Sequence, residues 1–234
     1  AANATPHTHL YLLLAATWTL YAAASFRDPG YVEPMDAAAP PHQVIPPVAE
    51  PSATTTAPSA PTSHLSDALL TRPLCLHCDA VLLPRTKHCH DCCRCVRRMD
   101  HHCWWLGNCV GEKTHGNFVA YRAAQASLLF AIAAAALTAP HDGAGAGTAA
   151  LEVTASVVCT SLCALGGCAA LMLLVFQCAL VLRGETTWEK LKRKHLNASM
   201  QLPPEMRPYD RGPARNVLIF LGCVADVAGA SVPP

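Results

Sequence analysis

Three long apolar runs divide the chain and predict three transmembrane helices. The first lies within residues 1–26, which carry no formal charge, and the second is the alanine-rich segment 118–140. The third lies within residues 151–183, where no formal charge occurs from Val153 to Leu182. About 20 helical residues cross a hydrocarbon core, so each run can span a bilayer. The pattern predicts an α-helical multi-pass membrane protein with three transmembrane helices.

Polar segments separate these runs. Residues 27–66 begin with an Arg-Asp-Pro-Gly string, which ends the first helix, and continue as a linker rich in Pro, Ala, Ser and Thr. This linker has too few large apolar residues to bury a core, so it is expected to be disordered. Residues 67–117 form a cysteine-rich domain, residues 141–150 a short turn, and residues 184–234 a C-terminal tail.

The distribution of positive charge predicts how the chain lies in the membrane. None of the 17 lysines and arginines precedes the first run or lies in the turn at 141–150. The positive-inside rule therefore places the cysteine-rich domain and the tail in the cytosol, and the N-terminus and the turn on the lumenal side. With 14% charged residues and a net charge of +1, the chain is not expected to bind nucleic acid.

Residues 75–109 hold eight of the 13 cysteines and five of the 12 histidines, in two copies of C-x2-C-x9-H-x6-C offset by 14 positions. Each copy offers three thiolates and one imidazole, which is a complete shell for a structural Zn²⁺ ion. A disulfide framework is the alternative, but it does not explain a histidine in register in both copies. Short hairpins that depend on metal for folding are expected here. The predicted ligands are Cys75, Cys78, His88 and Cys95 in one site, and Cys89, Cys92, His102 and Cys109 in the other.

Three chemically active residues beside His102 belong to neither ligand set: Asp100, His101 and Cys103. A thiol, an imidazole that takes its proton and a carboxylate that orients the imidazole are the parts of an activated nucleophile. The alternative is a free cysteine beside a zinc site. Cys93, the other spare cysteine of this stretch, is interpreted as a bystander thiol.

The string HCHDCCRCVRRMDHHCWWLGNCVG, residues 88 to 111, resembles the DHHC-type protein S-acyltransferases, or palmitoyltransferases. The resemblance implies that Cys103 accepts a fatty acyl group from acyl-CoA and passes it to a cysteine of a substrate protein. It also implies that His101 is the base and that Asp100 polarises it. The family's two structural zinc ions agree with the ligand sets above.

Further motifs extend the resemblance along the chain. Asp-Pro-Gly at 28–30 is similar to a motif that follows the family's second transmembrane helix, which implies that the first family helix is absent from this sequence. Residues 186–189 match a Thr-Thr-x-Glu motif implied to pack near the active site, and residues 209–216 resemble a C-terminal motif implied to be structural. The chain departs from the family at Trp104, where proline is usual, and at Thr114, where asparagine is usual.

Two functional classes follow from these observations. The first is a protein-cysteine S-palmitoyltransferase that uses acyl-CoA by ping-pong chemistry and acts on cytosolic, membrane-proximal cysteines. The resemblance is nearest to compact members of the Golgi and endoplasmic reticulum, which gives the expected location. The second is a zinc-stabilised membrane scaffold or pseudoenzyme. Trp104 and the missing first helix favour it, and the intact Asp100, His101 and Cys103 oppose it. A conventional metalloprotease is disfavoured because no H-E-x-x-H string occurs.

Overall fold

The computed structural model describes residues 8–34, 74–140 and 146–224. The predicted linker from residue 35 onward and the first residues of the cysteine-rich domain lie outside these ranges. Among the described residues, three helices are long and apolar enough to cross a membrane, as the apolar runs predict. They are α1 (Thr8–Phe26), α3 (His115–Leu137) and α4 (Ala146–Leu182).

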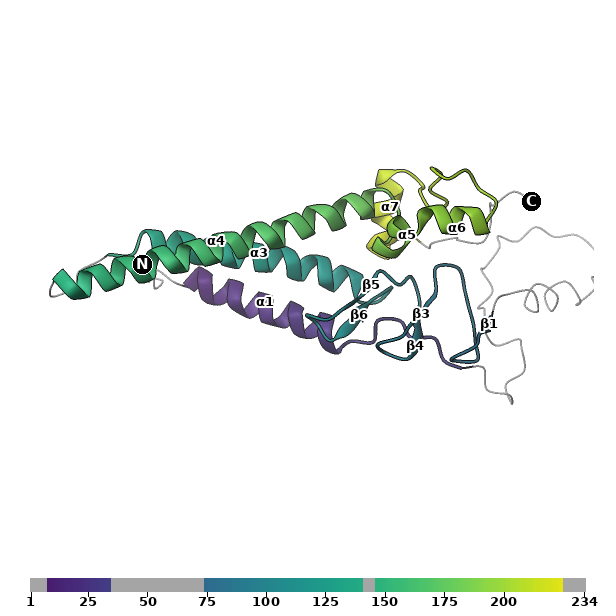
Figure 1. Ribbon diagram of the computed structural model, residues 1–234, viewed down its shortest axis with the longest axis horizontal. Helices are drawn as coiled ribbons and strands as arrows, with labels where there is room; N and C mark the ends of the chain where they lie inside the picture. The colour runs from purple at the N-terminus through teal and green to yellow at the C-terminus, as the bar shows by residue number, and fades with distance from the viewer. Residues whose placement is uncertain (1–7, 35–73, 141–145, 225–234) are drawn as a thin grey trace, which may run out of the picture.

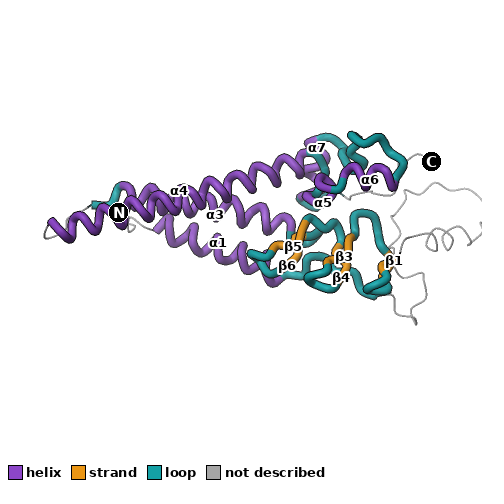
Figure 2. Tube along the Cα trace, viewed as in Figure 1, coloured by secondary structure: helices purple, strands orange, loops and turns teal. Residues whose placement is uncertain are grey.

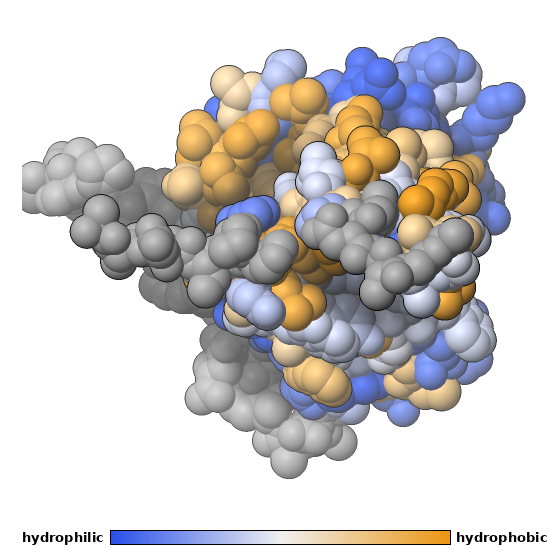
Figure 3. Space-filling model, turned by 90° about the vertical axis from the view of Figure 1, so that its left-hand side faces the viewer, coloured by the Kyte–Doolittle hydropathy of each residue, from blue (hydrophilic) through white to orange (hydrophobic). Residues whose placement is uncertain are grey.

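The three helices lie side by side in an elongated bundle, and α3 packs against both α1 and α4 (Figure 1). Close approach of α4 to α3 depends on Gly167, because a Cβ atom there would meet the ring of Phe130 at 3.0 Å. Large apolar side chains such as Leu165 and Met172 point outward from α4 and are about two-thirds exposed or more. Seen along the bundle from the end opposite the hairpins, orange hydrophobic side chains gather on its flanks (Figure 3). Such a surface suits lipid.

Two predicted boundaries need correction. The helix predicted at 118–140 begins at His115 and ends at Leu137. The helix predicted at 151–183 begins at Ala146, inside the segment expected to be a turn. The first of these two helices ends at Leu137, shortly before Pro140, which cannot continue a helix. Both helices begin earlier than predicted because a helix does not need a strongly apolar residue at each position. A helix continues through polar residues as long as its backbone hydrogen bonds can form.

The cysteine-rich domain consists of short hairpins at one end of the bundle, as its ligand spacing predicts (Figure 2). Its antiparallel pairs are β1 (Leu74–Cys75) with β2 (Ala80–Val81), β3 (Lys87–Cys89) with β4 (Arg94–Val96), and β5 (His101–Cys103) with β6 (Asn108–Val110). The Asp-Pro-Gly segment connects α1 to this domain. The carboxylate of Asp28 accepts hydrogen bonds from the backbone N–H groups of Gly30 and Tyr31 at 2.9 Å, and an ion pair joins it to Lys113.

After α4 the chain folds back through three short helices, α5 (Thr187–Leu191), α6 (Arg193–Ser199) and α7 (Pro213–Phe220). The buried Asn216 of α7 donates to the carbonyl of Leu182 at 2.9 Å and to the carboxylate of Asp210 at 2.8 Å. These bonds tie α7 to the end of α4. The geometry agrees with the structural role expected for residues 209–216.

Candidate functional site

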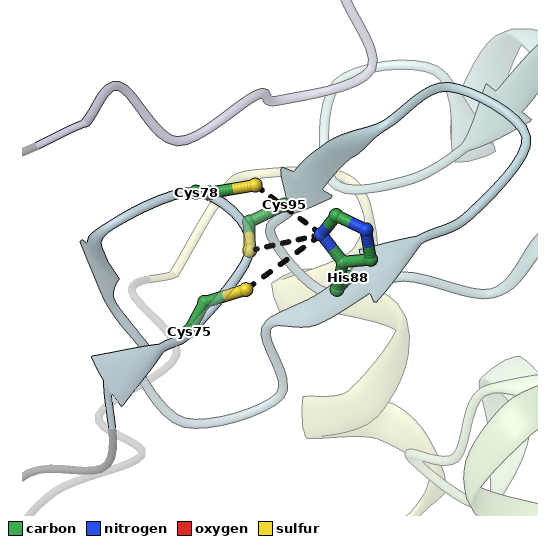
Figure 4. A group of neighbouring side chains, drawn as sticks. All are labelled: Cys75, Cys78, His88 and Cys95. Carbon is green, nitrogen blue, oxygen red and sulfur yellow. Dashed lines mark hydrogen bonds between the residues drawn. The ribbon is translucent and has the colours of Figure 1, made fainter.

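The first predicted ligand set comes together around His88 (Figure 4). Its Nδ1 atom lies 3.6 Å from the sulfur of Cys75, 3.2 Å from that of Cys78 and 3.9 Å from that of Cys95. A tetrahedral zinc ion with its usual bond lengths holds sulfur and nitrogen ligands roughly 3.6 Å apart. The four groups therefore fit a zinc ion.

The second predicted ligand set has the same geometry around His102. Its Nδ1 atom lies 3.6 Å from the sulfur of Cys89, 3.3 Å from that of Cys92 and 3.6 Å from that of Cys109. The described residues contain two clusters that could hold a metal ion, and these are the two sets that the 14-residue register predicts. Each has four protein donors, so zinc bound there would be a structural cross-link with no position open to substrate.

The 14-residue repeat continues into a third hairpin, which the ligand spacing alone did not reveal. Cys103 occupies the position that Cys75 and Cys89 hold in the first two hairpins. The backbone N–H groups two and three residues later favour ionisation of its sulfur and lower its pKa, and the same holds for Cys75. The third hairpin carries Leu106 where the other two have their second cysteine. Cys103 thus lies in a zinc-knuckle backbone without the partner ligands.

Cys103 lies beside the imidazole that the sequence assigns to it. His101 Nδ1 donates to Asp100 Oδ2 at 2.7 Å, which leaves the other ring nitrogen free to interact with the Cys103 thiol. The ring of His101 also packs edge-on against Phe118 at the start of α3, with 5.3 Å between centroids. The structure therefore brings together Asp100, His101 and Cys103 as a connected set.

Electrostatics favour an ion pair between the thiol and the imidazole. Burial alone would lower the pKa of His101, but its hydrogen bonds to Asp100 and Cys103 outweigh this and raise the pKa to about 9. Burial likewise opposes ionisation of Cys103, yet the bonds from His101 and from the backbone N–H of Leu106 lower its pKa below the usual value. A thiolate is the nucleophilic form of cysteine, so this environment suits nucleophilic chemistry.

Asp100 is almost completely buried and is held from the far side by the tail. Thr187 donates to it twice, from its backbone N–H to Oδ1 and from its hydroxyl to Oδ2, both at 2.7 Å. Thr186 caps α5 by accepting from the backbone N–H of Glu189 at 3.2 Å, and Glu189 accepts from the Thr186 backbone N–H at 2.8 Å. The Thr-Thr-x-Glu string is thus a helix cap whose second threonine orients the aspartate.

Comparison with known proteins identifies the family of this protein. A family model described as DHHC palmitoyltransferase matches residues 70–194, which is more than half of the 234 residues. The chain belongs to the DHHC palmitoyltransferase family. The match contains both metal clusters, the connected set at Cys103 and the Thr-Thr-x-Glu string.

Individual relatives agree with this membership. The chain is 59% identical over 44 residues to Protein S-acyltransferase 10 of Arabidopsis thaliana, covering 19% of this chain and 13% of that protein. It is 36% identical over 121 residues to Palmitoyltransferase ZDHHC18 of Homo sapiens, covering 50% and 31%. It is 29% identical over 164 residues to Palmitoyltransferase ERF2 of Eremothecium gossypii, covering 68% and 43%. The chain thus spans less than half the length of each of these relatives.

The two departures from the family pattern occupy different environments in this DHHC protein. The side chain of Trp104 is 84% exposed, so it replaces the usual proline without filling any space in the core. Thr114 is fully buried, and its hydroxyl donates to the carbonyl of Cys109 at 3.0 Å and accepts from the N–H of Gly111 at 3.1 Å. Thr114 therefore holds the second metal-binding segment against the start of α3.

An apolar cleft lies between α1 and α3, and its wall includes Trp105, two residues after Cys103. The thiol packs in a buried cluster with residues of α1 and α3 that include Ala24, Phe118 and Tyr121. A cleft of about 240 Å³ adjoins this cluster; its lining residues are Thr17, Trp18, Tyr21, Trp105 and Tyr121. Trp105 Nε1 donates to the hydroxyl of Tyr121 at 3.0 Å, and this bond fixes one wall of the cleft.

Two residues of the site were missed from the sequence. Gln177 of α4 donates to Asp100 Oδ2 at 3.1 Å, and His115 of α3 contacts Gln177. A signal for Gln177 was present, because a polar side chain in an apolar spanning segment usually has a function. Gln177 carries no formal charge, so the charge pattern of that segment does not reveal it. No spacing rule pointed to His115.

Proposed function

We propose that this chain is a protein-cysteine S-palmitoyltransferase that transfers a fatty acyl group from acyl-CoA to cysteines of substrate proteins. The observation that carries the proposal is the connected set of Asp100, His101 and Cys103 beside an apolar cleft between α1 and α3. A thiolate in the same buried cluster as Tyr121, which lines the cleft, suits a substrate that has a thioester at the end of a hydrocarbon chain. The names of the relatives, S-acyltransferase and palmitoyltransferase, support the same reading.

The reaction proceeds in two steps, acylation of Cys103 and transfer of the acyl group to a substrate cysteine. The Cys103 sulfur, whose proton resides on His101, attacks the thioester carbonyl; a new S–C bond forms, the bond to the CoA sulfur breaks, and the CoA thiolate takes the proton from His101. In the second step the thiol of a substrate protein loses its proton to His101 and attacks the acyl carbon. The bond between the acyl carbon and the Cys103 sulfur then breaks, and Cys103 leaves as a thiolate paired with the protonated His101. Asp100 keeps its negative charge and stabilises the imidazolium in both steps.

The metal clusters serve this chemistry by shaping the domain. Zinc bound by the two ligand sets would cross-link hairpins that have little apolar core of their own. The hairpin β5–β6, which bears Cys103, shares His102 and Cys109 with the second cluster. Loss of that cluster would therefore displace the nucleophile.

Orientation and location belong to the same proposal. The positive-inside rule supports a cytosolic position for the hairpins and the tail, so the nucleophile acts on cytosolic cysteines near the membrane. The resemblance to compact family members supports the Golgi or endoplasmic reticulum membrane. The polypeptide partners are proteins with a membrane-proximal cysteine, and the bilayer supplies the surroundings of the acyl chain.

Acylation of the purified protein by labelled palmitoyl-CoA tests the proposal. Wild type should take up label that hydroxylamine releases, and Cys103→Ser should not. Cys93→Ser is the matched control, because Cys93 is exposed and lies in neither metal cluster. Full labelling of Cys103→Ser would refute the assignment of the nucleophile. An unlabelled wild-type protein that retains two zinc ions per chain would instead support a zinc-stabilised scaffold.

A further inference from the structure

Gln177 connects a membrane-spanning helix to the catalytic aspartate. It lies near the end of α4, is only 4% exposed, and its Nε2 atom has two acceptors. One is Asp100 Oδ2 at 3.1 Å, and the other is the hydroxyl oxygen of Thr187 at 3.2 Å. A single amide group therefore contacts both the Asp100 carboxylate and Thr187, the residue that holds this carboxylate.

His115 fixes which way this amide points. The ring nitrogen Nε2 of His115, at the start of α3, lies 2.9 Å from Gln177 Oε1. The buried Nδ1 atom of His115 has no hydrogen-bond partner among the described residues. A neutral ring with its proton on Nε2 leaves no N–H group unpaired, and it donates to the Gln177 oxygen.

The flipped orientation of the Gln177 amide is less favourable, because it leaves buried polar groups without hydrogen-bond partners. If the amide were flipped, its oxygen would face the Asp100 carboxylate, and its NH₂ group would need an acceptor on His115. The proton of His115 would then lie on Nδ1, where it has no partner within the described part of the chain. The flipped state is unfavourable because two acceptors, the Gln177 oxygen and the Asp100 carboxylate, would face each other, and the buried Nδ1–H of His115 would be unpaired. The order of donation is therefore His115 to Gln177 to Asp100.

We propose that Gln177, oriented by His115, is a positioning residue for Asp100, through which α3 and α4 set the direction of the His101 imidazole toward Cys103. This inference rests on the proposed acyltransferase function. Asp100 Oδ2 accepts from His101, Gln177 and the Thr187 hydroxyl, so loss of the Gln177 donor changes the carboxylate geometry on which the His101 bond depends. Thr187 still holds the carboxylate in place, so the fold does not depend on Gln177 alone.

Single-turnover acylation of Cys103 by labelled palmitoyl-CoA measures the effect. Gln177→Met keeps the length of the side chain and removes the amide, and it should slow acylation roughly 10- to 100-fold, the range expected when a reacting group is slightly misplaced. The concentration of acyl-CoA at half-saturation should stay unchanged, because the cleft is intact. Gln125→Met is the matched control. Gln125 also lies on a spanning helix, but its oxygen accepts from Arg122.

A double-mutant cycle separates positioning from general destabilisation. In an Asp100→Ala background, Gln177→Met should have no further effect, since it acts through the carboxylate that is gone. An equal loss in both backgrounds would overturn the proposal, and so would a wild-type rate in Gln177→Met. If the wild type itself is not acylated, the proposed function fails and this inference falls with it.

A rescue pair at His115 covers the case in which Gln177→Met does not fold. His115→Met removes the donor and should slow acylation by a factor similar to or smaller than that of Gln177→Met. His115→Gln places an amide N–H near the original Nε2 position and should restore most of the rate. Equal rates for the two His115 variants, each with two zinc ions per chain, would show that the donor has no positioning role.

Discussion

Arg85 and Glu189, 104 residues apart in the chain, form a buried two-pronged ion pair. Arg85 Nε donates to Oε1 of Glu189 and Nη2 to Oε2, both at 2.8 Å, and both side chains are at most 6% exposed. Nη2 also donates to the carbonyl of Gly184 at 3.0 Å, and the guanidinium stacks over the ring of Tyr209. The pair joins the cysteine-rich domain to the helix cap that orients Asp100.

Removal of one partner of this pair should destabilise the protein strongly. Arg85→Met should lower the free energy of unfolding by about 3–5 kcal/mol, because it leaves the Glu189 carboxylate buried without its counter-charge. Arg97 and Glu112 form a comparable ion pair at 2.9 Å, but both are 40% exposed or more. Arg97→Met should therefore cost about 1 kcal/mol or less. Denaturant unfolding in detergent measures both, and equal costs would show that burial of the pair does not matter.

Substitution of the adjacent histidines His101 and His102 should have different effects, because we expect His102 to bind zinc and His101 to act as the base. His102→Ala should reduce bound zinc to fewer than two ions per chain and unfold the β5–β6 hairpin, because His102 belongs to the second cluster. His101→Ala should keep both ions but slow acylation of Cys103 by roughly 10² to 10⁴, the usual contribution of a general base. Metal content by mass spectrometry is compared with the acylation rate of each variant. Zinc loss in His101→Ala with zinc retained in His102→Ala would contradict the register.

Leu106 should keep Cys103 free of metal. Leu106→Cys restores the C-x2-C spacing of the first two hairpins at residues 103 and 106 and places a second thiol on a backbone already shaped as a zinc knuckle. We expect this variant to bind a third zinc ion, with His101 nearby as a further ligand, and to lose acylation. Leu106→Ser is the control for loss of the buried side chain, and it should retain two ions. A zinc content of two in Leu106→Cys would contradict the prediction.

The two neighbouring tryptophans should differ in importance. Trp105→Ala removes a wall of the apolar cleft and the bond to the Tyr121 hydroxyl, so it should lower the acylation rate at least about tenfold, the cost of misplacing a substrate. Trp104→Ala removes a side chain that is 84% exposed, and it should change stability by no more than about 0.5 kcal/mol. Thermal unfolding and acylation rates of the two variants are compared side by side. A larger loss in Trp104→Ala would show that this side chain contacts the substrate or the bilayer during turnover.

Local spacing in the sequence determined the metal-binding part of this protein. A C-x2-C turn and a histidine ten residues later need only short hairpins to meet, so the ligands of His88 and His102 could be assigned without a fold. The same register assigns His102 to the metal, which leaves His101 as the histidine available to the Cys103 thiol. Apolar runs of sufficient length likewise predicted three spanning helices, because a bilayer imposes a minimum length on any segment that crosses it.

The tertiary structure decided which donors surround Asp100, although the Thr-Thr-x-Glu resemblance already implied that Thr187 lies near the site. Its partners Thr187 and Gln177 are 87 and 77 residues away in the sequence, and no local periodicity relates them to the cysteine-rich domain. A buried carboxylate needs several donors, and which donors reach it depends on how α3, α4 and the tail pack. The sequence by itself predicted the metal-ligand sets and pointed to Cys103 as the proposed nucleophile, whereas the packing of distant helices determined how the aspartate behind them is held.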